Sequence, residues 1–362
     1  MKRALLLALS LVSALSLVAQ QPTQLPLWTR GTLDIHQLST GRGNAAFFVF
    51  PDGTTMLLDA GGDAAKQIAG YITRMMEKPR LDYAVLTHYH GDHMAAIPEV
   101  GAAIPIGTFI DRGTSFLPPP ADDATVKTYR AFIADKHSEP IRVGANDQIV
   151  LKREPKAFEN FEVRNVAANG EVWNGEGNGA HAIFPATYAA EDKPTENMCS
   201  IGLRIRYGKF DFFTGGDMPG VPEAGAPDWT SVETAVAKVI GATDVHVANH
   251  HGSIDPESAF FLATLKSPVI ILPAWSPTHP SQDSLKRMLT KRLYPGPRDI
   301  FVTKLYDSTK ESIGSRVDQL KATHGHIVVR VAPGGDRFQV YVLDETSDDL
   351  HVLSVSGPYD SH

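Results

Sequence analysis

The chain has 362 residues, of which 43% are hydrophobic and 21% are charged. This length can bury a large core, and the composition is ordinary for a soluble globular protein of one or two domains. The formal net charge of −7 disfavours non-specific binding to polyanions, so long nucleic acid is not an expected partner. Cys199 is the only cysteine, which excludes an internal disulfide, and we expect it to be a small buried apolar residue.

The N-terminal residues have the pattern of a secretory signal peptide. Lys2 and Arg3 precede an apolar run over residues 4–18, and polar residues follow Ala19. The run is too short to be a convincing membrane-spanning helix, and an uncleaved anchor is the alternative. We therefore expect residues 1–21 to be a signal peptide. The mature protein is then expected to be exported, either periplasmic or secreted, with no membrane span.

The next part of the chain predicts a β-hairpin, a helix and a further strand, because its apolar residues alternate and then take helical spacing. The expected elements are strands at 33–37, 45–50 and 55–59, a helix at 64–76 and a strand at 83–86. This last strand leads directly into the most informative stretch of the sequence.

Three histidines and an aspartate lie within residues 88–93, and each is a good ligand for a borderline divalent metal. His88 and His90 are two residues apart, so on extended backbone they point the same way and can share one ion. Asp92 and His93 follow Gly91, which permits a sharp turn toward a second ion. A polar surface loop is the alternative, but only 14 histidines occur in the whole chain. The cluster therefore predicts a metal site, with two ions roughly 3.5–4 Å apart.

Residues 107–165 differ from the segments around them. Leu117-Pro118-Pro119-Pro120 interrupts regular structure, and 126–136 has the pattern of an isolated helix. We expect 107–165 to be an insertion that lies over the metal site. The glycine-rich stretch 169–179 is expected to be a loop.

The second half of the chain returns to alternating strands and helices. The expected elements are strands at 201–207 and 210–214, a helix at 232–240, strands at 244–248 and 269–272, a helix at 284–293, and a hairpin formed by 327–331 and 338–343. We expect one hydrolase domain over 22–350 and a C-terminal tail at 351–362.

Polar, metal-competent residues recur where the predicted strands end. After the cluster at 88–93 come Asp217, the pair His250 and His251, and His279. Strand ends gather at one edge of a layered α/β structure. The sequence therefore predicts that these distant residues form a single cleft.

The run His88-Tyr89-His90-Gly91-Asp92-His93 resembles the H-x-H-x-D-H motif of the metallo-β-lactamase superfamily. Asp59 resembles the aspartate of that family's first motif, Asp217 its bridging aspartate, and His250 or His251 its last metal histidine. This resemblance implies an αββα sandwich, an α/β fold with two mixed β-sheets flanked by helices.

A closer resemblance is to the metallo-hydrolase domain of ComEC-type DNA-uptake proteins and their free-standing relatives. It rests on four segments, at 33–46, 197–203, 249–253 and 279–280, and covers about 30–345. Residues 249–253, Asn-His-His-Gly-Ser, are the most specific of the four. The resemblance implies a hydrolase with its substrate site at the edge where the metal loops meet.

The ligand set combines the chemistry of these residues with the resemblance. His88 and His90 are expected to bind the first ion, and Asp92 and His93 the second, with Asp217 bridging them. Zinc is the expected metal in both positions, with manganese or iron as alternatives. One of His250 and His251 should complete the second site, and His251 is preferred. Adjacent residues on extended backbone point apart, so both are not expected to bind one ion.

The first ion lacks an obvious third histidine. The resemblance places one near Glu196-Asn197, where the chain has none. Asn197 could supply an oxygen ligand, the position could be open, or His181 could fold in. The expectation that both ions are bound depends on which residue, if any, completes the first site.

The expected catalytic residues are Asp92, Asp217 and His279, acting with water activated by the ions. His279 could donate to an oxyanion or a leaving group, with capping of the strand–loop junction as the alternative. The leading hypothesis is an exported hydrolase of a phosphodiester or nucleotide-type small molecule. A β-lactam or lactone hydrolase and a non-catalytic metal-binding or sensing protein are the alternatives.

Overall fold

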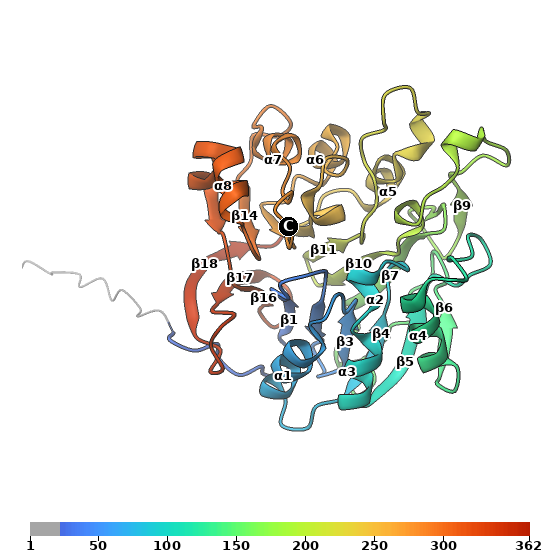
Figure 1. The fold of residues 1–362 in the computed structure, drawn as a ribbon. Coiled ribbons are helices and arrows are strands. Elements are labelled where there is room, and N and C mark those ends of the chain that lie inside the picture. Colours follow the sequence, from blue (N-terminus) through green and yellow to red (C-terminus); the bar gives the residue numbers. More distant parts are fainter. Residues whose placement is uncertain (1–21) are drawn as a thin grey trace, which may run out of the picture.

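The computed structural model describes residues 22–362, so the predicted signal peptide at 1–21 lies outside the described residues. Two nine-stranded sheets pack face to face, and helices cover their outer sides (Figure 1). Among residues 22–362, no helix is both long and apolar enough to cross a membrane.

The first sheet is mixed and joins the two ends of the described chain. Its order is β18 (Val352–Asp360), β17 (Arg337–Leu343), β16 (His326–Val331), β1 (Leu33–Gln37), β2 (Ala46–Val49), β3 (Thr55–Leu58), β4 (Leu81–Val85), β5 (Ile106–Asp111) and β6 (Ser138–Pro140). Strands β3 to β6 run parallel to one another, while the strands from β18 to β3 pair antiparallel.

The second sheet is also mixed. Its order is β15 (Leu320–Ala322), β14 (Asp299–Val302), β13 (Val269–Leu272), β12 (Val245–Val247), β11 (Phe210–Thr214), β10 (Gly202–Tyr207), β7 (Phe161–Ala168), β8 (Glu171–Trp173) and β9 (Ala180–Ala182). Strands β11 to β15 are parallel. Their carboxyl ends therefore point to one edge of the sheet.

Helices cover both outer faces of this sandwich (Figure 1). On the first sheet they are α1 (Ala65–Met75), α2 (Gly91–Met94), α3 (Ile97–Ala103) and α4 (Ala124–Ile133), and on the second α5 (Val232–Ile240), α6 (Ala259–Leu265), α7 (Gln282–Leu289) and α8 (Asp307–Ile313). The predicted αββα sandwich is confirmed.

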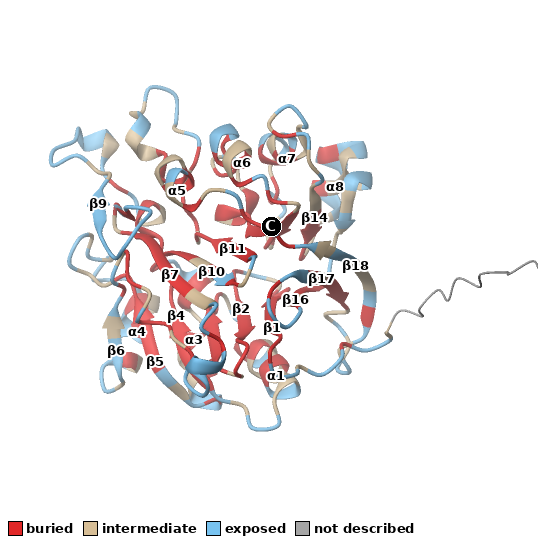
Figure 2. Cartoon of the chain, turned by 180° about the vertical axis from the view of Figure 1, so that it is seen from behind, coloured by how far each residue is buried: buried red, intermediate tan, exposed pale blue. Residues whose placement is uncertain are grey.

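Side chains alternate between the two faces of a strand, so the first sheet has a separate hydrophobic core on each face. Phe47 and Phe48 are neighbours on β2, and successive strand residues point to opposite faces. Phe47 packs in the core beneath α1, α3 and α4, whereas Phe48 packs in the core between the two sheets. Figure 2 shows buried residues concentrated in the strands and exposed residues on the outer sides of the helices.

Two expected boundaries differ from the structure. Strands β5 and β6 lie within the segment 107–165 and pair in the first sheet, and β7 begins in that segment and pairs in the second. Helix α4 buries Val126, Tyr129 and Ile133, so it packs on the sheet instead of standing isolated. The expected tail at 351–362 contains β18, which pairs with β17. β18 forms a hairpin with β17, but only Val352 of its residues is buried and it contains Gly357 and Pro358, so its sequence lacks the apolar alternation of a strand.

Candidate metal centre

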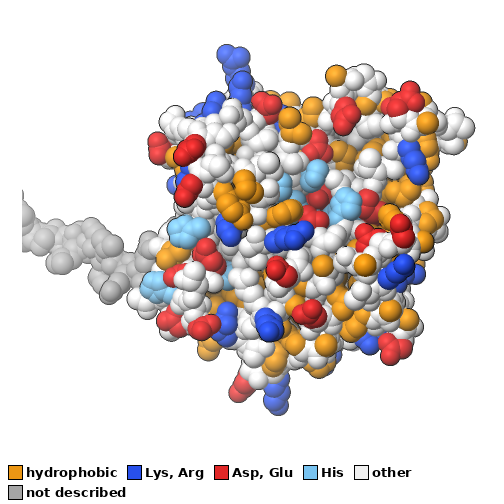
Figure 3. Space-filling model, viewed as in Figure 1, with side chains coloured by type: hydrophobic (Ala, Val, Ile, Leu, Met, Phe, Trp, Pro, Cys, Tyr) orange, Lys and Arg blue, Asp and Glu red, His pale blue; other side chains and the backbone are white. Residues whose placement is uncertain are grey.

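Loops from both sheets bring the predicted ligands together. His88 and His90 follow β4, Asp92 and His93 lie in α2, and Asp217 follows β11. The pair His250-His251 lies in a 3₁₀ segment, Asn249–Gly252, directly after β12. Figure 3 shows histidines gathered near the middle of one face, with acidic side chains among them. The predicted convergence of distant strand ends is therefore confirmed.

Four of these residues form one ligand group. Asp92, His93, Asp217 and His251 each offer an atom within 4.8 Å of the others. His93 Nε2 lies 3.2 Å from Asp217 Oδ1, and His251 Nε2 lies 3.3 Å from Asp92 Oδ2. Two imidazoles and two carboxylates in this space make a complete four-ligand set for a divalent ion.

A second ligand group lies beside the first and shares Asp217. Ligand atoms of His88, His90 and Asp217 also lie within 4.8 Å of one another. His88 Nε2 is 3.0 Å from His90 Nδ1 and 3.7 Å from Asp217 Oδ2. The two oxygens of Asp217 thus face different groups, which is the geometry of a bridging carboxylate.

The nitrogen contacts in these groups fit a bound cation. His93 Nδ1 lies 2.7 Å from Asp59 Oδ2 and His251 Nδ1 lies 3.1 Å from the carbonyl of Pro273, so both Nδ1 atoms act as donors. Each Nε2 atom then presents a lone pair, and the two Nε2 atoms are only 3.2 Å apart. Two lone pairs at this distance repel. Without a metal, a proton on His93 relieves the repulsion, because Asp217 and Asp59 raise its pKa well above the usual value despite its burial. A metal ion in place of that proton would satisfy both nitrogens, so the residues present suit a metal ion.

The electrostatics of the site favour positive charge at its centre. Burial disfavours ionisation of Asp217, but the imidazoles of His93, His251 and His88 hold the pKa of its carboxyl well below the usual range. Burial, together with His93, holds the pKa of His88 well below its usual value, so His88 is the neutral imidazole that a metal ligand must be. An anionic carboxylate this deeply buried is costly unless a cation compensates it.

His250 and His251 both lie at the metal centre, and of the two only His251 belongs to a ligand group, in agreement with the expectation that they do not share one ion. The backbone that carries them is not extended, however. Their φ angles are +43° and +54°, in the left-handed region that residues other than glycine rarely adopt. Two successive left-handed residues turn the chain tightly, so adjacent side chains no longer point apart. His251 joins the group of Asp92, His93 and Asp217, as expected. His250 lies on the side of the other Asp217 oxygen, Oδ2.

His250 lies next to the ligand group that lacks a third imidazole. Its Nδ1 is 2.8 Å from Asp255 Oδ1, and its Nε2 is 3.8 Å from Asp217 Oδ2. Donation from Nδ1 to Asp255 leaves the Nε2 lone pair directed toward the centre, and a carboxylate behind an imidazole commonly fixes a metal ligand in this way.

Asn197, which the sequence offered as an oxygen ligand, lies next to His250. Its Nδ2 is 3.3 Å from His250 Nε2, and its Oδ1 is buried without a hydrogen-bond partner. His181, the other alternative, is exposed on β9 and bonds to Asn174 through Nδ1 at 2.7 Å. His181 therefore does not fold into the metal centre.

Asp59 supports the ligands without joining either group. It is fully buried, and it accepts hydrogen bonds from Thr87 N at 2.8 Å, from Asn44 Nδ2 at 3.0 Å and from His93 Nδ1. Gly61 follows two residues later, where an added Cβ would lie 1.6 Å from the Asp92 carbonyl. The glycine thus allows the β3 loop to pack directly against the metal-binding loop.

The ion pair between Glu196 and Arg112 is a supporting feature that the sequence reasoning missed. Glu196 Oε1 accepts a hydrogen bond from the backbone N–H of Tyr89, between the two histidines, at 2.7 Å. Arg112 donates to both oxygens of Glu196, and its guanidinium lies 4.7 Å from the Tyr89 ring centre. Glu196 occupies the region where the resemblance placed a histidine, which was the only sequence signal for it.

The change Glu196→Gln is expected to weaken metal binding by about 10- to 100-fold, because it disturbs the backbone that carries His88 and His90 and leaves Arg112 without its counter-charge. Metal dissociation constants measured by competition with a chromophoric chelator check this. Glu154→Gln is the matched control, since Glu154 forms an exposed ion pair with Arg30. Equal affinity in the two variants would show that Glu196 does not position the loop.

A buried network holds the other metal-binding loop. Asn249, which precedes the histidine pair, donates through Nδ2 to Glu233 Oε1 at 2.8 Å and through its backbone N–H to Glu257 Oε1 at 3.2 Å. Burial and the neighbouring Glu257 raise the pKa of Glu233 to about 8. Two buried carboxyl groups thus anchor the turn whose left-handed residues carry the ligands.

His279 lies against the metal centre but outside both ligand groups. Its ring stacks on His251 with centroids 5.2 Å apart, and it is 7% exposed. Its Nδ1 is buried without a partner. Burial and the nearby His251 lower the pKa of His279 to about 4, so the ring is neutral and carries one N–H. Cys199 is buried, as expected, and burial raises the pKa of its thiol to about 12, which disfavours the thiolate form.

Comparison with known proteins identifies the first part of the chain. Residues 39–170 match the family model described as the metallo-beta-lactamase superfamily. This range includes His88–His93 and ends before Asp217. Residues 39–170 are therefore similar to a metallo-β-lactamase superfamily domain. The sandwich of two mixed sheets between helices is the fold of that superfamily, whose members bind divalent metals, and the two groups around Asp217 make a candidate dinuclear site.

The chain is similar in sequence to one curated protein and, at low identity, to several solved structures. A "Probable metallo-hydrolase YhfI" of Bacillus subtilis (strain 168) is 30% identical over 95 residues, which are 26% of this chain and 37% of that protein. A putative metal-dependent hydrolase from Parabacteroides distasonis is 12% identical, with 76% and 94% of the two chains covered and a TM-score of 0.41. The diiron β-hydroxylase CmlA of Streptomyces venezuelae is 14% identical, with 83% and 54% covered and a TM-score of 0.43.

Proposed function

We propose that this metallo-hydrolase superfamily protein is a dinuclear hydrolase of small phosphodiester or nucleotide-type substrates. The observation that carries the proposal is Asp217, whose Oδ1 lies 3.2 Å from His93 Nε2 and whose Oδ2 lies 3.7 Å from His88 Nε2. A carboxylate that faces two ligand groups sets two ions close together, as in the paired sites that clamp the attacking and leaving oxygens of a phosphoryl centre.

In this proposal the two ligand groups hold different ions. His88, His90 and His250 hold the first, Asp92, His93 and His251 hold the second, and Asp217 belongs to both. Asn197 lies beside His250, with its Nδ2 3.3 Å from His250 Nε2, and its Oδ1 would be an oxygen donor for the first ion. Zinc suits this mixture of imidazole and carboxylate ligands, with manganese or iron as alternatives. Bound ions would supply Lewis acidity and water activated near neutral pH.

The remaining polar residues act on the substrate and on protons. The neutral ring of His279 carries one N–H beside the centre, and we propose that it stabilises an oxyanion or a leaving group. Asp92 is 21% exposed at its side chain, so it is the ligand carboxylate open to solvent and to a departing proton. Asp59 orients His93 from behind and does not touch substrate.

The choice of a small phosphodiester rests on charge and on the ComEC-like segments. The formal charge of −7 opposes binding of long nucleic acid but leaves small phosphodiesters acceptable. The segment Asn249–Gly252, which resembles the P-H-H-G-S motif of that family, carries both histidines that approach Asp217.

Hydrolysis of bis(p-nitrophenyl) phosphate and of a dinucleotide by the metal-loaded full chain tests this function. We expect turnover that a chelator abolishes and that zinc or manganese restores. Parallel assays use nitrocefin and a panel of lactones. Turnover of those alone would replace the phosphodiester with an acyl substrate, and tight metal binding without any turnover would indicate a sensing protein.

We also propose that the protein is exported by a signal peptide at residues 1–21, from the basic start and apolar run of the sequence. N-terminal sequencing of the protein recovered from the periplasm or medium of an expressing bacterium tests this. Recovery only from the cytoplasm, with Met1 or Lys2 as first residue, would contradict export.

A further inference from the structure

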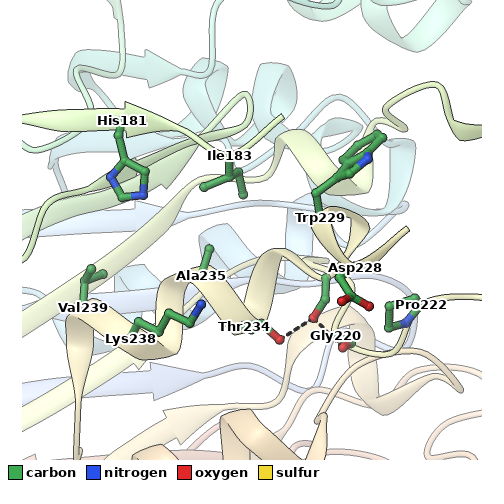
Figure 4. A pocket seen from close by; sticks show the side chains of 11 residues that line it. His181, Ile183, Gly220, Pro222, Asp228, Trp229, Thr234, Ala235, Lys238 and Val239 are labelled. Atoms are coloured by element: carbon green, nitrogen blue, oxygen red, sulfur yellow. Dashed lines mark hydrogen bonds between the residues drawn. The ribbon is translucent and has the colours of Figure 1, made fainter. Parts of the chain in front are cut away.

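A cavity of about 530 Å³ lies outside the two ligand groups, between α5 and the segment that begins with β9 (Figure 4). Its volume is within the range of small-molecule sites. Ile183, Ala235 and Val239 give it apolar walls. Its polar groups are separated, with His181 and Lys238 toward one end and Trp229 and Asp228 toward the other.

The cavity adjoins the loop that leaves the metal centre. Gly220 lines it and lies three residues after Asp217, so their Cα atoms are at most about 11 Å apart. The backbone N–H of Gly220 donates to the carbonyl of Asp255 at 3.1 Å, and the carboxylate of Asp255 accepts from His250. A ligand in the cavity could therefore extend to the metal centre.

Trp229 gives one end of the cavity a fixed aromatic surface. The indole makes an edge contact with Phe184, with centroids 5.4 Å apart, and a tilted contact with Tyr188 at 6.1 Å. Phe184 is itself held over Gly170, where an added Cβ would lie 2.1 Å from the ring. The carboxylate of Asp228 is next to the indole. This end therefore suits a planar ring that carries N–H donors.

The other end carries basic side chains. Lys238 is exposed on α5, and His181 extends toward it from β9 (Figure 4). His181 Nδ1 is 2.7 Å from Asn174 Oδ1, which fixes the ring and leaves Nε2 free. An ammonium beside an imidazole favours an anionic group, such as a phosphate.

We propose that this cavity binds a nucleoside monophosphate unit, with its base against Trp229 and its phosphate at Lys238. Such a unit has a planar base with N–H donors at one end and an anionic phosphate at the other. These two parts match the aromatic end and the basic end of the cavity. Binding of this unit is independent of the function proposed above. The further step, that the unit is part of the hydrolysed substrate, rests on that function.

Calorimetric titration of AMP into the full-length protein, metal-loaded and after chelation, tests the proposal. We expect saturable binding that persists after chelation. Trp229→Leu and Lys238→Gln should each weaken AMP by about tenfold, the size of one lost stacking or charged contact. Adenosine and ribose 5-phosphate, each lacking one half of the ligand, should bind more weakly than AMP by a similar factor.

Lys209→Gln is the matched control, because Lys209 is an exposed lysine paired with Asp336 and away from the cavity. Unchanged AMP affinity in both Trp229→Leu and Lys238→Gln, or binding that disappears on chelation, overturns the proposal. Persistent AMP binding without phosphodiester turnover would overturn only the proposed function. Turnover with AMP affinity insensitive to both variants would overturn only this cavity assignment.

Discussion

The variant Asp217→Asn is expected to lose both metal ions and at least about 1,000-fold in turnover. Asp217 faces both ligand groups, so removal of its charge weakens both sites together. Metal ions contribute several kcal/mol of transition-state stabilisation, and each 1.4 kcal/mol or so corresponds to a factor of ten in rate. Metal content by mass spectrometry and turnover of the phosphodiester check the two parts separately.

Asp283→Asn is the control for this variant, since Asp283 is an exposed aspartate on α7. It should retain the wild-type metal content and rate. Retention of two ions per chain by Asp217→Asn would contradict the bridging role, and loss of only one ion would place Asp217 in a single site.

Separate substitution of the two adjacent histidines is expected to remove different ions. His251→Ala should release the ion of Asp92 and His93, because His251 Nε2 lies 3.3 Å from Asp92 Oδ2. His250→Ala should release the ion of His88 and His90. Each variant should bind one ion per chain in place of two, with affinity for the lost ion reduced by more than the 10- to 100-fold or so typical of a residue behind a ligand.

Metal stoichiometry after equilibrium dialysis measures this result, and the double variant should bind no ion tightly. His181→Ala is the control, because His181 bonds to Asn174 outside the metal centre. Two tightly bound ions in His250→Ala would show that His250 only positions Asp255, and Asn197 would then be tested in the same way.

Much of the local structure was predictable because its signals are local. Helix α5 spans Val232–Ile240 and strand β13 spans Val269–Leu272, at the predicted bounds. Both have apolar patterns bounded by clear breaks. The cluster at 88–93 was recognisable for the same reason, since its ligands are close together in sequence. Strands β14 and β18 were not predicted. β14 pairs with β13, from which α7 separates it in the chain, and β18 has a single buried residue and so lacks a core-facing pattern.

The arrangement of His250 and His251 was not predictable by alternation. Alternation on extended backbone led to the expectation that the two side chains do not share one ion, which agrees with the ligand groups, but both residues are left-handed in the structure instead of extended. Such backbone is unfavourable for histidine and persists only where surrounding contacts hold it. Those contacts are made to Asn249 by Glu233 of α5 and by Glu257, which lies in the loop just before α6.

By itself, the sequence of this protein determined the donor chemistry: three histidines and an aspartate within six residues, and later polar residues placed after apolar strands. The tertiary structure alone decided which donors lie close enough together to share an ion. It set Asp217 between two groups, excluded His181, turned both late histidines inward and placed Glu196 behind Tyr89. The physical reason is that ligand type is a property of single side chains, whereas coordination requires distances of a few ångströms that only sheet pairing and packing establish.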